Sequence, residues 1–219
     1  MASPKATRRG SSSRHRALWK ATYEETPYHS LPWFDPDPSP QIVLAVAEKF
    51  LPPRSAVLDV GCGAGSNVLF LAREGFESHG VDISPGAIRA ANERARADGL
   101  AIDVRVGDAL HLDFPTAKFG GVTDNGCFHT LPIRRRPDYA TEVARVLRPG
   151  GAFVISWVAR EHTGARGPRH RPSLEEVTRT FEERFLFVRT AFHRSAVDGF
   201  PSVYDAWLTR RSRPQPPPR

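Results

Sequence analysis

The stretch Val57-Leu58-Asp59-Val60-Gly61-Cys62-Gly63-Ala64-Gly65 decides the fold of this chain. It opens with a short apolar run, which is typical of a buried parallel strand, and a helical pattern follows from Ser66 to Glu74. Glycine is needed where the backbone takes a positive φ or where a ligand approaches it closely. A glycine-rich turn between a buried strand and a helix therefore predicts a ligand site at the carboxyl end of that strand.

Helix and strand patterns alternate on both sides of this turn, and a capping box at Ser173–Glu176 begins one more helix. Two strand-like runs near the end of the chain are joined by a short connection, so we expect them to pair as a hairpin. The sequence predicts an α/β fold, a Rossmann-like doubly wound mixed seven-stranded sheet with helices on both faces. The expected strands are 56–60, 77–82, 102–106, 121–124, 152–157, 185–192 and 202–208, and the expected helices before the capping box are 40–50, 66–74, 84–98 and 137–147.

Composition divides the chain into four parts. Residues 1–15 are basic and serine-rich, and residues 210–219 are rich in proline and arginine, so both are predicted to be disordered tails. Residues 16–39 hold several aromatic side chains among prolines. Such a segment is not expected to form a long helix, and we expect it to lie over the active site as a cap. Residues 40–209 form the predicted domain.

The charge distribution argues against a nucleic-acid-binding surface on the domain. The net charge is +7, but ten basic groups lie in the first twenty and last ten residues, and without them the chain carries about −3. Solvated tails are favoured over docking arms for nucleic acid. No stretch approaches the roughly 18 consecutive apolar residues of a membrane helix. The two cysteines make no disulfide framework, no spacing predicts a metal site, and a cytoplasmic location is expected.

An acidic residue ends the second predicted strand, in Gly80-Val81-Asp82-Ile83-Ser84. A carboxylate at this position can accept hydrogen bonds from both hydroxyls of a ribose, and it would repel a 2′-phosphate. The dinucleotide-binding fingerprint needs a third glycine at position 66, where this chain has Ser66. The turn and Asp82 together therefore favour a nucleoside ligand other than a dinucleotide.

These residues resemble class I S-adenosylmethionine-dependent methyltransferases. Asp59–Gly65 looks like the first motif of that family, Asp82 matches its ribose-binding acid, Val106–Ala109 looks like its adenine-side motif, and Val146–Gly151 resembles the turn before its fifth strand. The resemblance implies S-adenosylmethionine as the cofactor and S-adenosylhomocysteine as the product. The cofactor-binding residues that it implies are Trp33, Asp59, Gly61, Cys62, Gly63, Gly65, Asn67, Asp82, Ile83, Asp108, Ala109, Asp124 and Asn125.

The loop after the fourth strand, Thr123–Pro132, holds an Asp-x-Gly-x-Phe-His stretch. It is similar to a small-molecule subgroup that includes thiopurine and other thiol S-methyltransferases and tellurite-resistance methyltransferases. That subgroup also carries a Pro-Trp-Asp segment that folds over the cofactor. This chain has Pro32-Trp33-Phe34-Asp35-Pro36-Asp37, in which Phe34 is inserted and Asp37 replaces the usual glycine.

Tyr28, Trp33, Cys127, Phe128 and His129 are expected to contact the acceptor. His129 could orient the nucleophile or take its proton, or it could be a hydrogen-bonded residue that shapes the loop. The two aromatic residues of the cap are either walls of the pocket, where a ring gains cation–π attraction to a sulfonium, or packing anchors. The cysteines are expected to be small apolar fillers rather than reactive thiols.

The expected reaction is methyl transfer to a thiol or similar soft nucleophile of a small metabolite. A thiol with a pKa near 8.5 ionises readily, whereas a hydroxyl needs a positioned base. Three alternatives remain: N- or O-methylation of a small molecule, methylation of RNA or protein with the basic tails as docking arms, and a cofactor-binding sensor without turnover. Residues 160–172 are a candidate lid, no membrane partner is expected, and a monomer and a homodimer are both open.

Overall fold

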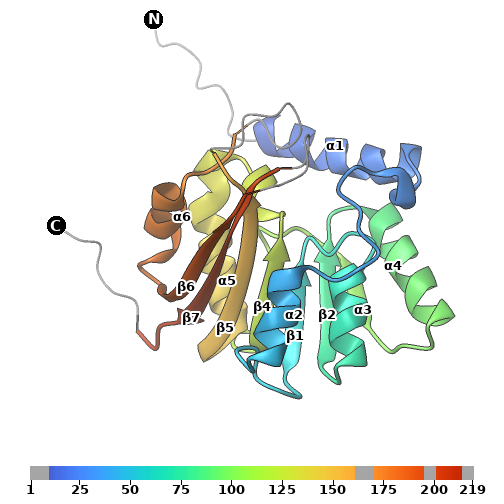
Figure 1. Cartoon of the computed structure of the whole chain (residues 1–219). Helices are drawn as coiled ribbons and strands as arrows, with labels where there is room; N and C mark the ends of the chain where they lie inside the picture. Colours follow the sequence, from blue (N-terminus) through green and yellow to red (C-terminus); the bar gives the residue numbers. More distant parts are fainter. Residues whose placement is uncertain (1–9, 161–169, 195–200, 214–219) are drawn as a thin grey trace, which may run out of the picture.

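The computed structural model describes residues 10–160, 170–194 and 201–213. A seven-stranded sheet with the order β3-β2-β1-β4-β5-β7-β6 forms its centre (Figure 1). The strands β1 to β5 are parallel, and β7 is antiparallel to both β5 and β6. The predicted mixed sheet with a terminal hairpin is therefore confirmed. The strands are β1 (Ala56–Val60), β2 (Glu77–Asp82), β3 (Asp103–Val106), β4 (Phe119–Asn125), β5 (Leu147–Val158), β6 (Phe185–His193) and β7 (Val203–Arg210).

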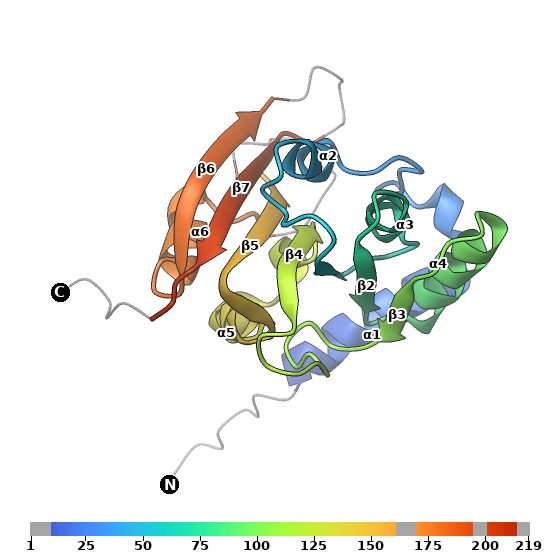
Figure 2. The same cartoon turned by 90° about the horizontal axis from the view of Figure 1, so that it is seen from below.

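Helices cover both faces of this sheet. Figure 2 shows α2, α3 and α4 on one face and α5 and α6 on the other. All five residues of β1 are buried between these two layers, as its apolar run predicts. The helices are α1 (Gly10–Glu25), α2 (Pro40–Ala47), α3 (Ser66–Arg73), α4 (Pro85–Ala97), α5 (Arg136–Val146) and α6 (Leu174–Phe181), with three short 3₁₀ turns, η1 (Tyr28–Ser30), η2 (Phe128–Thr130) and η3 (Ile133–Arg135).

Two features of the sequence set the helix boundaries. Ser84 accepts a hydrogen bond from the backbone N–H of Ala87 at the start of α4, and proline occupies the first helical position. The predicted capping box of α6 is present, with Ser173 and Glu176 bonding each other's backbone N–H groups. These caps explain why the predicted starts of both helices are confirmed.

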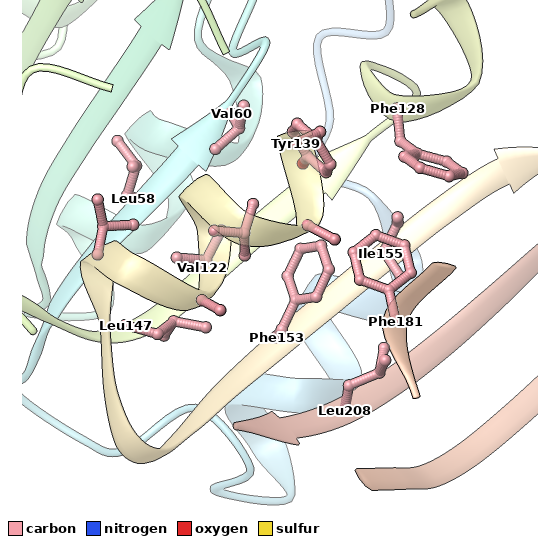
Figure 3. Packing of buried hydrophobic residues seen from close by; sticks show 14 of the residues in the cluster. Leu58, Val60, Val122, Phe128, Tyr139, Leu147, Phe153, Ile155, Phe181 and Leu208 are labelled. Carbon is pink, nitrogen blue, oxygen red and sulfur yellow. The ribbon is translucent and has the colours of Figure 1, made fainter. Parts of the chain in front are cut away.

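The larger core lies between the sheet and the α5–α6 layer (Figure 3). Phe128 from the η2 turn packs against Phe181 with ring centroids 5.2 Å apart and against Tyr139 at 5.7 Å. Phe153 of β5 joins the same cluster. The packing of Phe128 in the core therefore fixes the position of the loop after β4.

The expectation that residues 16–39 contain no long helix is wrong for their first part. Helix α1 spans Gly10–Glu25, so residues 10–15 of the predicted disordered tail are helical as well. The prolines that argue against a helix begin only at Pro27. In the other predicted tail, Arg210 is the last residue of β7, so the prediction of disorder is wrong at that position. Residues 1–9 and 214–219 of the two predicted tails lie outside the described residues.

None of the helices in the described ranges has the length and apolar character that are needed to cross a bilayer.

Candidate active site

The glycine-rich turn leaves β1 in a conformation that only glycine adopts easily. Gly61, Gly63 and Gly65 have φ values of +71°, +53° and +86°. A Cβ at Gly61 would lie 2.5 Å from Cβ of Cys127, and one at Gly65 would lie 2.9 Å from Cβ of Ala91 on α4. Gly61 and Gly65 therefore allow close packing within the protein, whereas Gly63 faces the hydroxyl of Tyr23 on α1.

Asp82 lies at the end of β2, directly beside this turn. Its carboxylate accepts the backbone N–H of Gly63 at 3.0 Å and that of Ser84 at 2.9 Å. Burial raises the pKa of Asp82, while these N–H groups and that of Ile83 lower it. Each carboxylate oxygen keeps a further lone pair for a ligand hydroxyl. The structure thus brings together the turn and the acid that the sequence assigned to the ribose.

Behind the turn, Asp59 is buried in the sheet. It accepts a hydrogen bond from Thr123 at 2.6 Å and is also bonded by Asn67. Burial raises its pKa to about 7. The Asn67 side chain in turn accepts the backbone N–H of Ser39, so these two predicted cofactor residues connect the cap to the sheet. Cys62 is buried beside Gly80, and burial raises the pKa of its thiol.

Asp108, the predicted adenine-side acid, already has two partners. One oxygen accepts the backbone N–H of Leu110 at 2.9 Å, and the other pairs with Arg16 of α1 at 3.1 Å. Ala109 is partly buried against the larger core. The side chain of Asp108 therefore lies under α1, close to the end of β3.

The loop after β4 is organised by Asp124, which is 1% exposed. Its carboxylate accepts the backbone N–H groups of Cys127 and Phe128 and the hydroxyl of Tyr139. Burial raises its pKa to about 7. Asp124 therefore shapes the loop from within. Asn125 is the exposed neighbour, and its side chain accepts a hydrogen bond from Gln41 of α2.

Phe128 and Cys127, two predicted acceptor contacts, are held by this loop in different ways. Phe128 is completely buried in the aromatic core, so it is not placed as a wall of a pocket. Cys127 packs against Gly61, and burial raises the pKa of its thiol. The side chain of Phe128 points into the core, and its backbone N–H donates a hydrogen bond to Asp124.

His129 is bonded in a way that argues for the loop-shaping alternative. Its Nδ1 accepts the backbone N–H of Val158 at 3.0 Å, so the proton of the neutral ring is on Nε2. Burial, reinforced by the nearby Arg136 cation, lowers its pKa to about 3. A ring that accepts through Nδ1 and avoids a second proton is poorly suited to take a proton from a nucleophile.

We expect His129→Gln to reduce the loss of stability in acid. The folded chain keeps His129 neutral, whereas the unfolded chain protonates it below about pH 6.5. The native state therefore binds fewer protons, and stability is lost as the pH falls through this range. Between pH 6.5 and pH 5 this contribution is about 2 kcal/mol. Urea denaturation at several pH values measures it, and an equal acid loss in the variant would contradict the buried neutral ring.

The cap segment runs along the carboxyl end of the sheet, with α1 across the upper edge in Figure 1. Trp33 is half-exposed, packs edge-on against Trp19 at 5.3 Å, and donates to the hydroxyl of Tyr23 at 3.3 Å. That hydroxyl lies 2.9 Å from the position of a Cβ on Gly63. Tyr28 instead packs on Phe34 and His29, and no contact among the described residues places it at the turn.

Sequence reasoning missed the contributions of α1. Tyr23 lies over the glycine turn, and its backbone carbonyl lies against Gly86 of α4. Burial and the negative charge of Asp82 raise the pKa of its hydroxyl. His15 bonds the backbone of Thr130 and accepts a hydrogen bond from Trp19. The spacing of His15, Trp19 and Tyr23 by four residues is a helical pattern that was available in the sequence.

One predicted element cannot be placed. Of the candidate lid at 160–172, residues 161–169 lie outside the described residues. Within the described ranges, no group of histidine, cysteine, aspartate and glutamate side chains is arranged to hold a metal ion.

Comparison with known proteins agrees with this geometry. Residues 57–151 match the family model of a methyltransferase domain. The matched part begins in β1 and ends within β5, so it contains the glycine turn, Asp82, Asp108 and Asp124. The 2-heptyl-1-hydroxyquinolin-4(1H)-one methyltransferase of Mycobacteroides abscessus is 30% identical over 125 residues, 57% of this chain and 54% of that protein. The chain spans about half the length of the curated relatives it matches.

Solved structures resemble nearly the whole chain. One, described for the conversion of a disulfide bond into a thioacetal group during echinomycin biosynthesis, superposes with a TM-score of 0.77 at 25% identity, covering 90% of this chain and 91% of that one. The 1,6-didemethyltoxoflavin-N1-methyltransferase of Burkholderia thailandensis, solved with S-adenosylhomocysteine, gives 0.74 at 20% identity, covering 97% and 94%. These likenesses establish the Rossmann-like methyltransferase fold.

Proposed function

We propose that this chain transfers a methyl group from S-adenosylmethionine to a small molecule. The observation that carries the proposal is the contact between Asp82 and the N–H of Gly63, which joins the acid at the end of β2 to the glycine turn at the end of β1. The matching methyltransferase domain and the structural neighbour with bound S-adenosylhomocysteine support it. Residues 16–39 would serve as the cap of this site.

The residues present fit the cofactor. Gly63 has no side chain on the surface that faces Tyr23, so the backbone can be approached closely there. Asp82 would hold the ribose hydroxyls, and Asp108 would hold the adenine amine after exchanging its contact with Arg16. When bound, S-adenosylmethionine supplies an activated methyl group. The chain itself has to hold the acceptor in line and exclude water.

We further propose a thiol or another soft nucleophile as the acceptor. Nδ1 of His129 already accepts the backbone N–H of Val158, so this histidine is poorly placed to act as the base that a hydroxyl acceptor needs. One structural neighbour is described for the conversion of a disulfide bond into a thioacetal group, which is a reaction of sulfur. The second candidate is N-methylation, because the neighbour from Burkholderia thailandensis is named as an N1-methyltransferase.

The function is tested with the purified chain in two steps. Calorimetry with S-adenosylmethionine is expected to show binding, and radiolabelled cofactor with matched arenethiols, anilines and phenols is expected to label the thiols first. Labelled amines or phenols with unlabelled thiols would end the preference for sulfur. The absence of cofactor binding at millimolar concentration would end the proposal as a whole.

Asp82→Ala is expected to weaken binding of S-adenosylmethionine by about 1–3 kcal/mol, since a hydrogen bond to a charged group is lost. Calorimetry measures the change, and thermal denaturation confirms that the variant folds. Asp98→Ala is the matched control, because Asp98 ends α4 and pairs with Arg73. An unchanged dissociation constant for Asp82→Ala would remove this residue from the ribose site.

A further inference from the structure

The carboxyl edge of the sheet carries a row of polar side chains that leads away from the proposed cofactor site. Asn125 on β4 pairs with Ser156 on β5, and Ser156 pairs with Asp205 on β7. Directly paired residues place their side chains on the same face of a sheet. Gln41 of α2 donates to Asn125, so this is the face that α2 covers. The row leads from the loop after β4 toward the far edge of the sheet.

The row ends in a hydrogen-bonded pair of side chains, Asp205 and His193, the last residue of β6. The side chain of Asp205 is 6% exposed, whereas that of His193 is 58% exposed. Nε2 of the imidazole faces the carboxylate. Among the described residues, none is found bonded to Nδ1. A buried carboxylate that holds one imidazole nitrogen orients the ring and leaves the other nitrogen for a ligand.

The direction of β6 places this pair at the same edge as the cofactor site. Because β7 is antiparallel to both β5 and β6, β6 runs parallel to β5. Its last residue therefore lies at the carboxyl edge, where Asp82 and Asn125 also end their strands. In open α/β sheets, this edge is where ligands bind.

Packing alone does not account for the polar row. One step further from the edge the same face is apolar, and Val154 and Trp207 pack there with Phe50 after α2. An apolar residue at 205 would continue this cluster, whereas a buried carboxylate costs free energy unless it is paired. The aspartate and its half-exposed partner histidine thus interrupt an apolar face at the edge where an acceptor would lie.

We propose that His193 and Asp205 recognise the far end of the methyl acceptor, an inference that rests on the proposed function. In the neutral ring, Nε2–H donates to Asp205, and Nδ1 accepts from an O–H or N–H group of the acceptor. Neighbouring strands lie about 4.8 Å apart, so Asp205 is two spacings, roughly 10 Å, from Asn125. The substrate class is an elongated small molecule with a nucleophile at one end and a hydroxyl or amino group at the other.

Two rigid probes test this inference. The thiol 4′-mercaptobiphenyl-4-ol carries the distal hydroxyl, and biphenyl-4-thiol lacks it. We expect the native chain to prefer the hydroxyl probe at least tenfold in kcat/KM, and His193→Ala to erase this preference. His193→Gln should retain part of it, because the amide can donate to Asp205 while its carbonyl accepts the hydroxyl. Asp205→Asn should weaken the preference, since Asp205 acts by positioning the ring.

The control variant is Arg189→Ala, which changes an exposed side chain of β6 four residues before His193 that pairs with Glu48. It should keep the native preference, and every variant should keep the native affinity for S-adenosylmethionine. A native chain that binds the cofactor but shows no preference, or a preference that survives His193→Ala, overturns this inference. A native chain that binds no cofactor overturns the proposed function instead.

A second measurement keeps the inference open to refutation if neither probe is methylated. With S-adenosylhomocysteine bound, the ¹⁵N resonance of His193 Nδ1 is followed by NMR while each biphenyl thiol is added. A shift caused by the hydroxyl probe alone supports the inference, and the absence of such a shift overturns it.

Discussion

Gly63→Val is expected to abolish binding of S-adenosylmethionine, raising its dissociation constant more than hundredfold. A Cβ at this position lies 2.9 Å from the hydroxyl of Tyr23, and the branched side chain would fill the space between the turn and α1. The backbone φ of +53° adds strain, because a β-branched residue rarely adopts positive φ. Calorimetry measures binding, and thermal denaturation measures the cost to the fold.

Gly75→Val provides the matched control for backbone strain. Gly75 has a φ of +81° after α3, and a Cβ there meets nothing within 4 Å. Both variants should lose about 1–2 kcal/mol of stability from the left-handed backbone, but only Gly63→Val should lose the ligand. If the folded Gly63→Val variant bound the cofactor with native affinity, the glycine turn would not be part of the cofactor-binding site.

The sequence predicts the parts of this fold that follow from periodicity and local capping. The apolar run of β1, the Ser84–Pro85 start of α4 and the capping box of α6 each depend on neighbouring residues, and each is confirmed. The expectation for residues 16–39 fails at α1 because the prolines of that segment begin only at Pro27, after the helix has ended. Taken alone, residues 14–25 show the helical spacing of His15, Trp19 and Tyr23.

The side-chain contacts of the candidate site could not be predicted in this way, because the partners are far apart in the sequence. Arg16 pairs with Asp108 across 92 positions, and no local pattern indicates that contact. The inward turn of Phe128 is also a tertiary property, fixed by Asp124 and by the space next to Phe181. Motif spacing therefore locates the turn and Asp82, but it does not show which loop residues face a ligand.

Asp124→Ala is expected to lower the free energy of unfolding by about 3–5 kcal/mol. The change leaves the N–H groups of Cys127 and Phe128 and the hydroxyl of Tyr139 without their acceptor, and each unpaired buried donor costs about 1–3 kcal/mol. Tyr139→Phe removes one of these bonds and should cost only about 1 kcal/mol. Urea denaturation measures both, and equal losses would mean that the carboxylate does not organise the loop.

Asp124→Asn separates the charge of this residue from its role as an acceptor. Burial raises the pKa of Asp124 to about 7, whereas the unfolded chain releases this proton near pH 3.9. The folded state therefore binds more protons between these values, and its stability falls as the pH rises through that window. The asparagine variant should lose less stability than the native chain between pH 5 and pH 7. If the free energy of unfolding changed with pH equally in the variant and the native chain, Asp124 would be ionised throughout this range. The hydrogen bonds of its carboxylate would then outweigh the cost of burying the charge.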